Sequence, residues 1–66
     1  MKNRLKVLRA EKNLTQEQLA SKAGMSRTTL AMIENEKATP DGDTIAALVK
    51  ALQTPANHIF FELDVV

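Results

Sequence analysis

Cysteine, tryptophan and tyrosine are absent from this 66-residue sequence, and histidine occurs once, as His58. The lack of cysteine excludes disulfides, thiolate metal sites and cysteine nucleophiles. A single histidine also excludes a zinc site built from several imidazoles. No apolar run approaches the roughly 18 residues that a membrane-spanning helix needs, and the polar start of the chain is unlike a signal peptide. We therefore expect a cytoplasmic protein that contacts no membrane.

The short chain allows one small domain, over residues 1–66, with almost no room for a small-molecule pocket. The formal net charge is only +1, but the charges are unevenly distributed. Residues 1–37 carry eight basic and four acidic side chains, a net of +4, whereas residues 38–66 carry one basic and four acidic side chains, a net of −3. The basic half favours a polyanionic partner; the alternative is a chance distribution of charge in a small domain.

The spacing of apolar residues and the signals at helix ends predict five helices. The first runs from about residue 3 to residue 12 and ends near Asn13. The second begins after Thr15, which can form a capping box with Gln18. It ends at Gly24, because glycine adopts the left-handed conformation that closes a helix.

The third predicted helix covers residues 27–35 and is capped by Ser26. Asp43 is the expected cap of the fourth helix, and Thr54-Pro55 reads as the cap and first-turn proline of a short fifth helix. Beyond Phe60, apolar and acidic residues alternate with the period of a strand, although the segment is also compatible with a tail. The predicted fold class is all-α, with five helices and a possible short C-terminal strand.

The most informative stretch spans about residues 15–35, where two helices are joined by a turn of about four residues centred on Gly24. Ala20 stands where the two helices cross closely, and Leu30 and Ile33 anchor the second helix. This is the helix-turn-helix pattern, in which the second helix enters the major groove of DNA.

The order of motifs resembles the phage-repressor and Cro-like helix-turn-helix family, also called the Xre family, over roughly residues 5–60. The segments that carry the likeness are Leu5-Lys6-Val7-Leu8-Arg9, Leu14-Thr15-Gln16-Glu17-Gln18-Leu19-Ala20, Gly24-Met25-Ser26, Ile33-Glu34-Asn35-Glu36-Lys37 and Pro40. The resemblance implies a lambda-repressor-like domain that binds duplex DNA. Glu36 and Gln53 depart from the family, which usually has glycine at both positions, and Glu36 places an acid near the expected phosphate.

The third helix offers candidates for reading bases on its outward face. With Leu30 and Ile33 directed inward, the candidate base-contacting residues are Arg27, Thr28, Ala31 and Met32. An arginine can donate two hydrogen bonds to guanine, and an outward methionine suits a thymine methyl group. The alternative is that Met32 packs against a neighbouring element.

The resemblance also implies contacts to phosphate and an ion pair. Gln16 looks like the family's phosphate-binding glutamine at a helix start, where free backbone amides attract the same anion; the alternative is an ordinary exposed glutamine. The further phosphate candidates are Ser26, Asn35, Lys37 and Thr39. Arg9 and Glu34 occupy positions that commonly form a salt bridge between the first and third helices; otherwise they are two independent surface charges.

A homodimer on a palindromic operator is expected, because one small helix-turn-helix unit reads too few bases and pairs of units bind half-sites about 34 Å apart. Residues 55–66 supply the expected dimer contact, since an exposed apolar patch usually marks an interface. The candidate interface residues are Ile59, Phe60, Phe61, Leu63 and Val65. The alternative is that Phe60 completes the core while Leu63 to Val66 form a disordered tail.

Enzymatic activity is not expected, nor is a metal or another cofactor. His58 and Glu62 are four residues apart, but two ligands are too few for a metal site. Asp41 and Asp43 resemble only a fragment of a calcium-binding loop. We expect a transcriptional regulator, most simply a repressor, without a small-molecule ligand. The alternatives are a protein-interaction module, such as the antidote of a toxin–antitoxin pair, and the controller protein of a restriction system.

Overall fold

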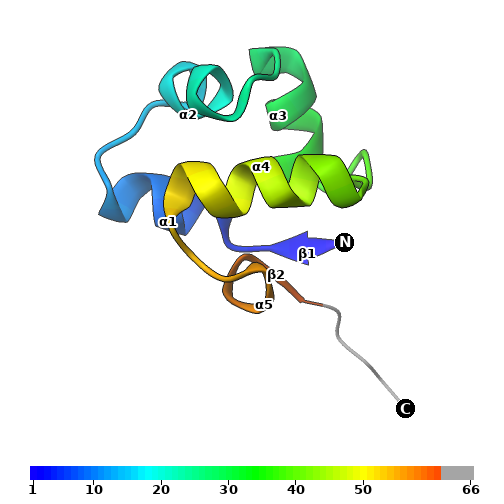
Figure 1. Ribbon diagram of the computed structural model, residues 1–66. Helices are drawn as coiled ribbons and strands as arrows, with labels where there is room; N and C mark the ends of the chain where they lie inside the picture. Colours follow the sequence, from blue (N-terminus) through cyan, green and yellow to red (C-terminus); the bar gives the residue numbers. More distant parts are fainter. Residues whose placement is uncertain (62–66) are drawn as a thin grey trace.

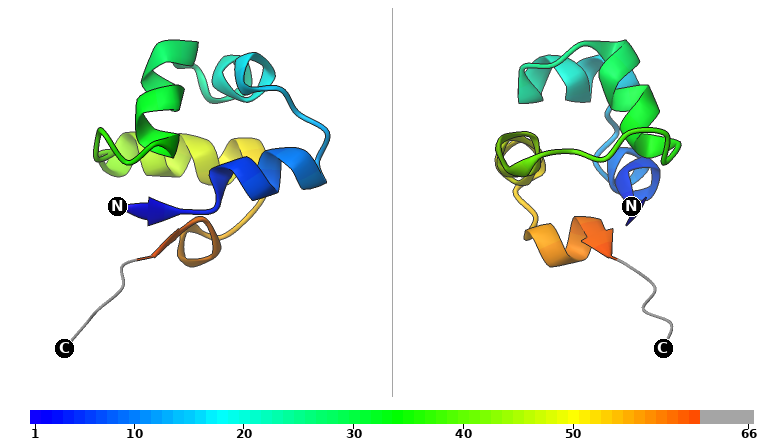
Figure 2. Two further views of the ribbon diagram at one scale, coloured as in Figure 1. Left: turned by 180° about the vertical axis from the view of Figure 1, so that it is seen from behind. Right: turned by 90° about the vertical axis from the view of Figure 1, so that its right-hand side faces the viewer.

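The computed structural model describes residues 1–61, which form five helices and two short strands. In chain order these are β1 (Lys2–Asn3), α1 (Leu5–Glu11), α2 (Gln16–Ala23), α3 (Arg27–Glu34), α4 (Gly42–Leu52), α5 (Ala56–Ile59) and β2 (Phe60–Phe61). Figures 1 and 2 show three levels, with α2 and α3 on one side, α1 and α4 in the middle, and α5 with β2 on the other side. The predicted all-α fold of five helices is confirmed.

Local capping determines the ends of the two helices that carry the helix-turn-helix pattern. The Gln18 backbone N–H donates to Thr15 Oγ1 at 3.0 Å, and the Thr15 N–H donates to Gln18 Oε1 at 2.8 Å, so the capping box is present. Gly24 ends α2 with a φ of 73°. Ser26 then begins α3, because its hydroxyl accepts the Thr29 N–H at 3.1 Å.

The starts of α1 and α4 differ from the sequence-based expectation. Helix α1 begins at Leu5 instead of residue 3, because Asn3 lies in β1 and its Oδ1 accepts the Leu5 N–H at 3.1 Å. Helix α4 is capped by Asp41 and not by Asp43, since Asp41 Oδ1 accepts the Thr44 N–H at 2.8 Å. That backbone hydrogen bond, followed by one to the Thr44 side chain, holds the pKa of Asp41 below its ordinary value.

The start of α5 also differs. Pro55 is the residue before the helix, and not its first residue, while Thr54 does not act as a cap. The Thr54 hydroxyl donates instead to the carbonyl oxygen of Leu52, at 3.0 Å, and so completes the end of α4.

The possible short C-terminal strand is present, and its partner lies at the other end of the chain. β2 pairs antiparallel with β1, so that Phe61 lies opposite Lys2 and Phe60 opposite Asn3. The Arg4 N–H also donates to the carbonyl oxygen of Ile59 at 2.8 Å. The two ends of the described chain are thus joined within one molecule.

The core collects apolar side chains from all five helices and from β2. Its buried members are Leu5, Leu8, Leu19, Ala20, Leu30, Ile33, Leu48, Leu52, Ile59 and Phe60. The expectation that Ile59 and Phe60 belong to an exposed patch is wrong, because α5 and β2 turn them into this core, where they are 0% and 8% exposed. Phe61 is 40% exposed, while Leu63 and Val65 lie outside the described residues.

None of the helices within residues 1–61 combines the length and the apolar character that crossing a membrane requires.

Candidate nucleic-acid interface

Helices α2 and α3 form a tight pair on one side of the molecule (Figure 2). The turn between them is closed by the Met25 N–H, which donates to the carbonyl oxygen of Ala20 at 2.9 Å. Leu30 and Ile33 on the inner face of α3 are 0% and 3% exposed. The helix is therefore anchored along one face, and the opposite face is left at the surface.

The outward face of α3 carries the predicted base-contacting residues. Arg27 and Thr28 are exposed at its first turn, Met32 is 43% exposed, and Ala31 is half-buried. Among the residues that the structure describes, Arg27 has no ion-pair partner. An unpaired cation, a hydroxyl and a polarisable apolar group thus share one helix face, which is a combination that suits the edges of base pairs.

Four of the five predicted phosphate-contacting residues, all except Gln16, lie around the two ends of α3. Ser26 caps its start, and its hydroxyl also donates to Thr29 Oγ1 at 2.9 Å. Asn35, Lys37 and Thr39 are exposed in the segment that follows it. This segment folds back on the helix, because the Lys37 N–H donates to the carbonyl oxygen of Met32 at 2.8 Å.

The two positions where the family usually has glycine have left-handed backbone conformations. Glu36 has a φ of 61° and Gln53 a φ of 53°. A residue with a Cβ atom adopts this conformation at a cost of roughly 1–2 kcal/mol, whereas glycine adopts it freely. The departures noted in the sequence therefore coincide with local strain after α3 and after α4.

Arg9 and Glu34 form an ion pair between α1 and α3. Arg9 Nε donates to Glu34 Oε2 at 2.7 Å, and Arg9 Nη2 donates to Glu34 Oε1 at 3.1 Å. Gln16, the first residue of α2, adds a third hydrogen bond from its Nε2 to Glu34 Oε1 at 3.0 Å. The carboxylate of Glu34 is 0% exposed, so it joins three helices beneath the surface.

A family model described as helix-turn-helix matches residues 5–59. The chain belongs to this helix-turn-helix family. An immunity repressor protein of Bacillus phage phi105 is 47% identical over 59 residues, which is 89% of this chain but only 41% of that repressor. An uncharacterized HTH-type transcriptional regulator of Methanocaldococcus jannaschii is 42% identical over 64 residues, or 97% of both chains. The resemblance found in the sequence is confirmed.

Asn3, which the sequence did not single out, holds α3 of this helix-turn-helix protein. The Asn3 side chain donates from Nδ2 to the carbonyl oxygen of Ile33, at 3.0 Å, near the end of α3. The contact spans 30 positions of the chain, and no periodicity or spacing in the sequence indicates it.

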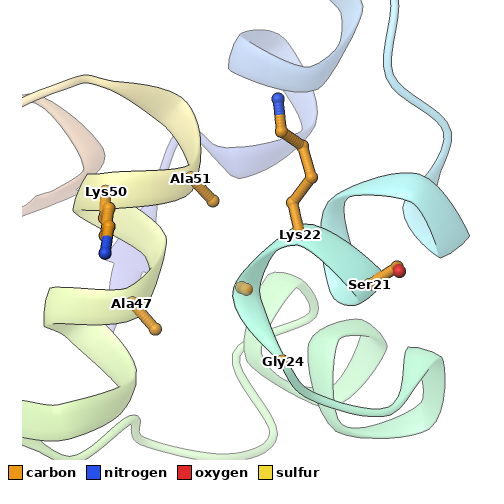
Figure 3. Close-up of a pocket in the computed structure, with 7 residues that line it drawn as sticks. Ser21, Lys22, Gly24, Ala47, Lys50 and Ala51 are labelled. Atoms are coloured by element: carbon orange, nitrogen blue, oxygen red, sulfur yellow. The ribbon is translucent and has the colours of Figure 1, made fainter.

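A groove of about 470 Å³ lies between the end of α2 and the side of α4, apart from the outward face of α3. Its lining is formed by Ser21, Lys22, Ala23, Gly24, Ala47, Lys50 and Ala51. Figure 3 shows Ala47 and Ala51 on α4 directed toward the end of α2. The chain was expected to have almost no room for a small-molecule pocket, and the groove shows that this expectation is wrong. Its lining contains no histidine or carboxylate for acid–base chemistry.

Proposed function

We propose that this chain binds duplex DNA sequence-specifically as a homodimer and represses transcription. The observation that carries the proposal is the outward face of α3, where Arg27, Thr28 and Met32 are exposed on a helix fixed from behind by its own core. In the helix-turn-helix arrangement this second helix lies in the major groove. Repression is further supported by the name of the phage relative, an immunity repressor.

Base reading in this proposal begins at the first turn of α3. The Arg27 guanidinium would donate two hydrogen bonds to O6 and N7 of a guanine, and Thr28 would contact an adjacent base. Met32 and the half-buried Ala31 lie one turn further along the helix, where they would contact thymine methyl groups. Asn35, next to the end of the helix, is assigned to phosphate together with Lys37.

Phosphate contacts on both sides of α3 would hold the helix in register. Gln16 and the free backbone amides at the start of α2 supply donors on one side, and the helix dipole favours an anion there. Ser26 lies at the start of α3, while Lys37 and Thr39 follow its end. Such contacts position the protein on the duplex without selecting a sequence.

The proposed dimer contact is centred on Phe61. Its ring is 40% exposed at the end of β2, beyond the buried Ile59 and Phe60. The acidic residues at this end of the chain would keep it away from the phosphates. The two protomers would then place their α3 helices in successive major grooves, about 34 Å apart.

Selection of binding sites from a pool of random duplexes tests the proposed function with the 66-residue chain. The expected result is a palindromic site with half-site centres one helical turn apart, or about 34 Å. Recovery of unrelated sequences, with the same affinity as the starting pool, would contradict sequence-specific binding.

Deletion of residues 61–66 tests the dimer. We expect a folded helical domain that sediments as a monomer and loses specific binding, because the buried Ile59 and Phe60 remain. Phe61→Ala is the matched point variant and is expected to shift the equilibrium in the same direction. A truncated protein that stays dimeric and binds the selected palindrome unchanged would place the interface elsewhere.

A further inference from the structure

The buried carboxylate of Glu34 contacts a residue that the proposed function assigns to DNA. Two of its hydrogen bonds come from Arg9, at 2.7 Å and 3.1 Å, and the third comes from Gln16 Nε2, at 3.0 Å. The bond from Gln16 is not needed to neutralise Glu34, because the Arg9 guanidinium already does so. It does, however, restrict the one side chain at the start of α2 that is assigned to phosphate.

The chemistry of the carboxamide determines what this restriction achieves. A glutamine amide has two N–H donors on nitrogen and an acceptor oxygen, whereas a carboxylate only accepts. Glu34 therefore selects the nitrogen end of the Gln16 amide and uses one of its two N–H groups. The second N–H stays on the same nitrogen and is available to another acceptor, and phosphate oxygens are acceptors only.

We propose that Glu34 is a positioning residue for DNA binding, which holds the Gln16 amide with one N–H ready for a phosphate oxygen. The inference rests on the proposed function and adds to it a residue that touches no DNA. Pre-orienting the donor reduces the rotamer entropy that would otherwise be lost when the phosphate is bound.

Arg9 makes this arrangement compatible with an anionic ligand. An unpaired Glu34 carboxylate next to Gln16 would repel a phosphate, whereas its ion pair with Arg9 is close to neutral. Arg9 Nη1 also donates to the carbonyl oxygen of Leu14, at 3.3 Å, two residues before Gln16. The same guanidinium thus neutralises the positioning residue and holds the backbone that leads into α2.

A thermodynamic cycle on DNA affinity tests the proposal. The background variant replaces the pair together, Arg9→Met with Glu34→Met, which keeps the net charge and avoids a stranded buried ion. Affinity for a short duplex of random sequence reports on phosphate contacts alone. Circular dichroism and thermal melting verify that each protein is folded.

We expect Gln16→Ala to weaken binding by about two- to ten-fold in the wild-type chain, as for one hydrogen bond. In the background that lacks the Arg9–Glu34 pair, the same substitution should lower the affinity for DNA by less than about two-fold. Lys37→Ala is the matched control, because Lys37 does not contact Glu34, and its effect should be equal in both backgrounds. Equal losses for Gln16→Ala in both backgrounds would overturn the proposal.

Side-chain ¹⁵N relaxation in the wild-type protein tests the same point without any substitution. The Gln16 Nε2 group should be more rigid than that of Gln53, which makes no side-chain hydrogen bond among residues 1–61. Equal mobility of the two amides would overturn the positioning role. Failure of the wild-type chain to bind any duplex would instead overturn the proposed function, and the positioning role with it.

Discussion

The helix-turn-helix segment and the C-terminal end of this domain are held by different kinds of contact. In residues 15–35, each helix begins at a side chain that binds a backbone N–H three residues ahead, as Thr15 and Ser26 do. In residues 53–61, the main contacts join distant parts of the chain: Phe60 pairs with Asn3, and the carbonyl oxygen of Ile59 accepts the Arg4 N–H.

The proposed DNA-binding surface therefore depends on two kinds of contact, local ones that shape its helices and distant ones that hold them in place. The caps and the turn at Gly24 shape α2 and α3 locally. The orientation of α3 depends in addition on residues far away in the sequence, namely Arg9 through Glu34 and Asn3 through the carbonyl oxygen of Ile33. Substitutions in the two regions should therefore have separable effects on folding and on binding.

The largest effect is expected from the buried aromatic residue at the C-terminal end. Phe60→Ala should lower the free energy of unfolding by about 3–5 kcal/mol, the range for a buried phenylalanine. Phe61→Ala is the matched control and should cost far less, since its ring is 40% exposed. Urea unfolding measures the free energy of unfolding of both variants. Equal losses would show that Phe60 is not buried more deeply than Phe61.

Loss of the interhelix ion pair should have the next largest effect. Arg9→Ala should cost more than the ~0–1 kcal/mol of an exposed pair, because it strands the Glu34 carboxylate, which is 0% exposed. A double-mutant cycle with Glu34→Ala on the free energy of unfolding measures the coupling. Additive losses would show that the two charges act independently.

The same contrast between local and distant contacts explains how far the sequence allows prediction. The ends of α2 and α3 could be predicted, because a capping box and a glycine in the left-handed conformation act within a few residues. β1 could not be predicted, because Lys2 and Asn3 become a strand only by pairing with Phe61 and Phe60. For the same reason the sequence alone left two alternatives open for Phe60, an exposed patch or the core, and pairing with Asn3 places it in the core.

In the candidate site, too, local features could be predicted from the sequence and distant contacts could not. The outward face of α3 could be predicted from helical spacing, which correctly placed Leu30 and Ile33 inside. The hydrogen bond from Gln16 to Glu34 could not, since it joins side chains 18 positions apart whose contact depends on how α2 packs on α3.

Phosphate contacts should differ in their salt dependence according to charge. Lys37→Ala should weaken binding to all duplexes similarly and reduce the salt slope by roughly one unit per protomer. Gln16→Ala should also weaken binding to all duplexes similarly, but it should leave the salt slope of binding unchanged because the amide is neutral. A change in sequence preference with unchanged non-specific affinity, for either variant, would contradict the assignment to phosphate.

The smallest effects are expected where a non-glycine residue has a left-handed backbone. Glu36→Gly and Gln53→Gly should each stabilise the fold by about 0.5–1 kcal/mol, because relief of strain exceeds the entropy that glycine loses. Only Glu36→Gly should also strengthen DNA binding, since it removes an acid near the predicted phosphate contact at Lys37. Thermal melting and filter binding distinguish the two, and a similar gain in affinity for Gln53→Gly would contradict this explanation.

Base reading by α3 is tested most directly by comparing the affinities of Arg27→Ala and of the wild-type protein for a selected site and for a random duplex. If Arg27 reads a base, the substitution should lower the binding free energy on the selected site by about 1–3 kcal/mol and relax the preference for one guanine per half-site. Binding to the random duplex should change far less. Equal losses on the selected and random duplexes would contradict base reading by α3 and would assign Arg27 to the phosphate contacts.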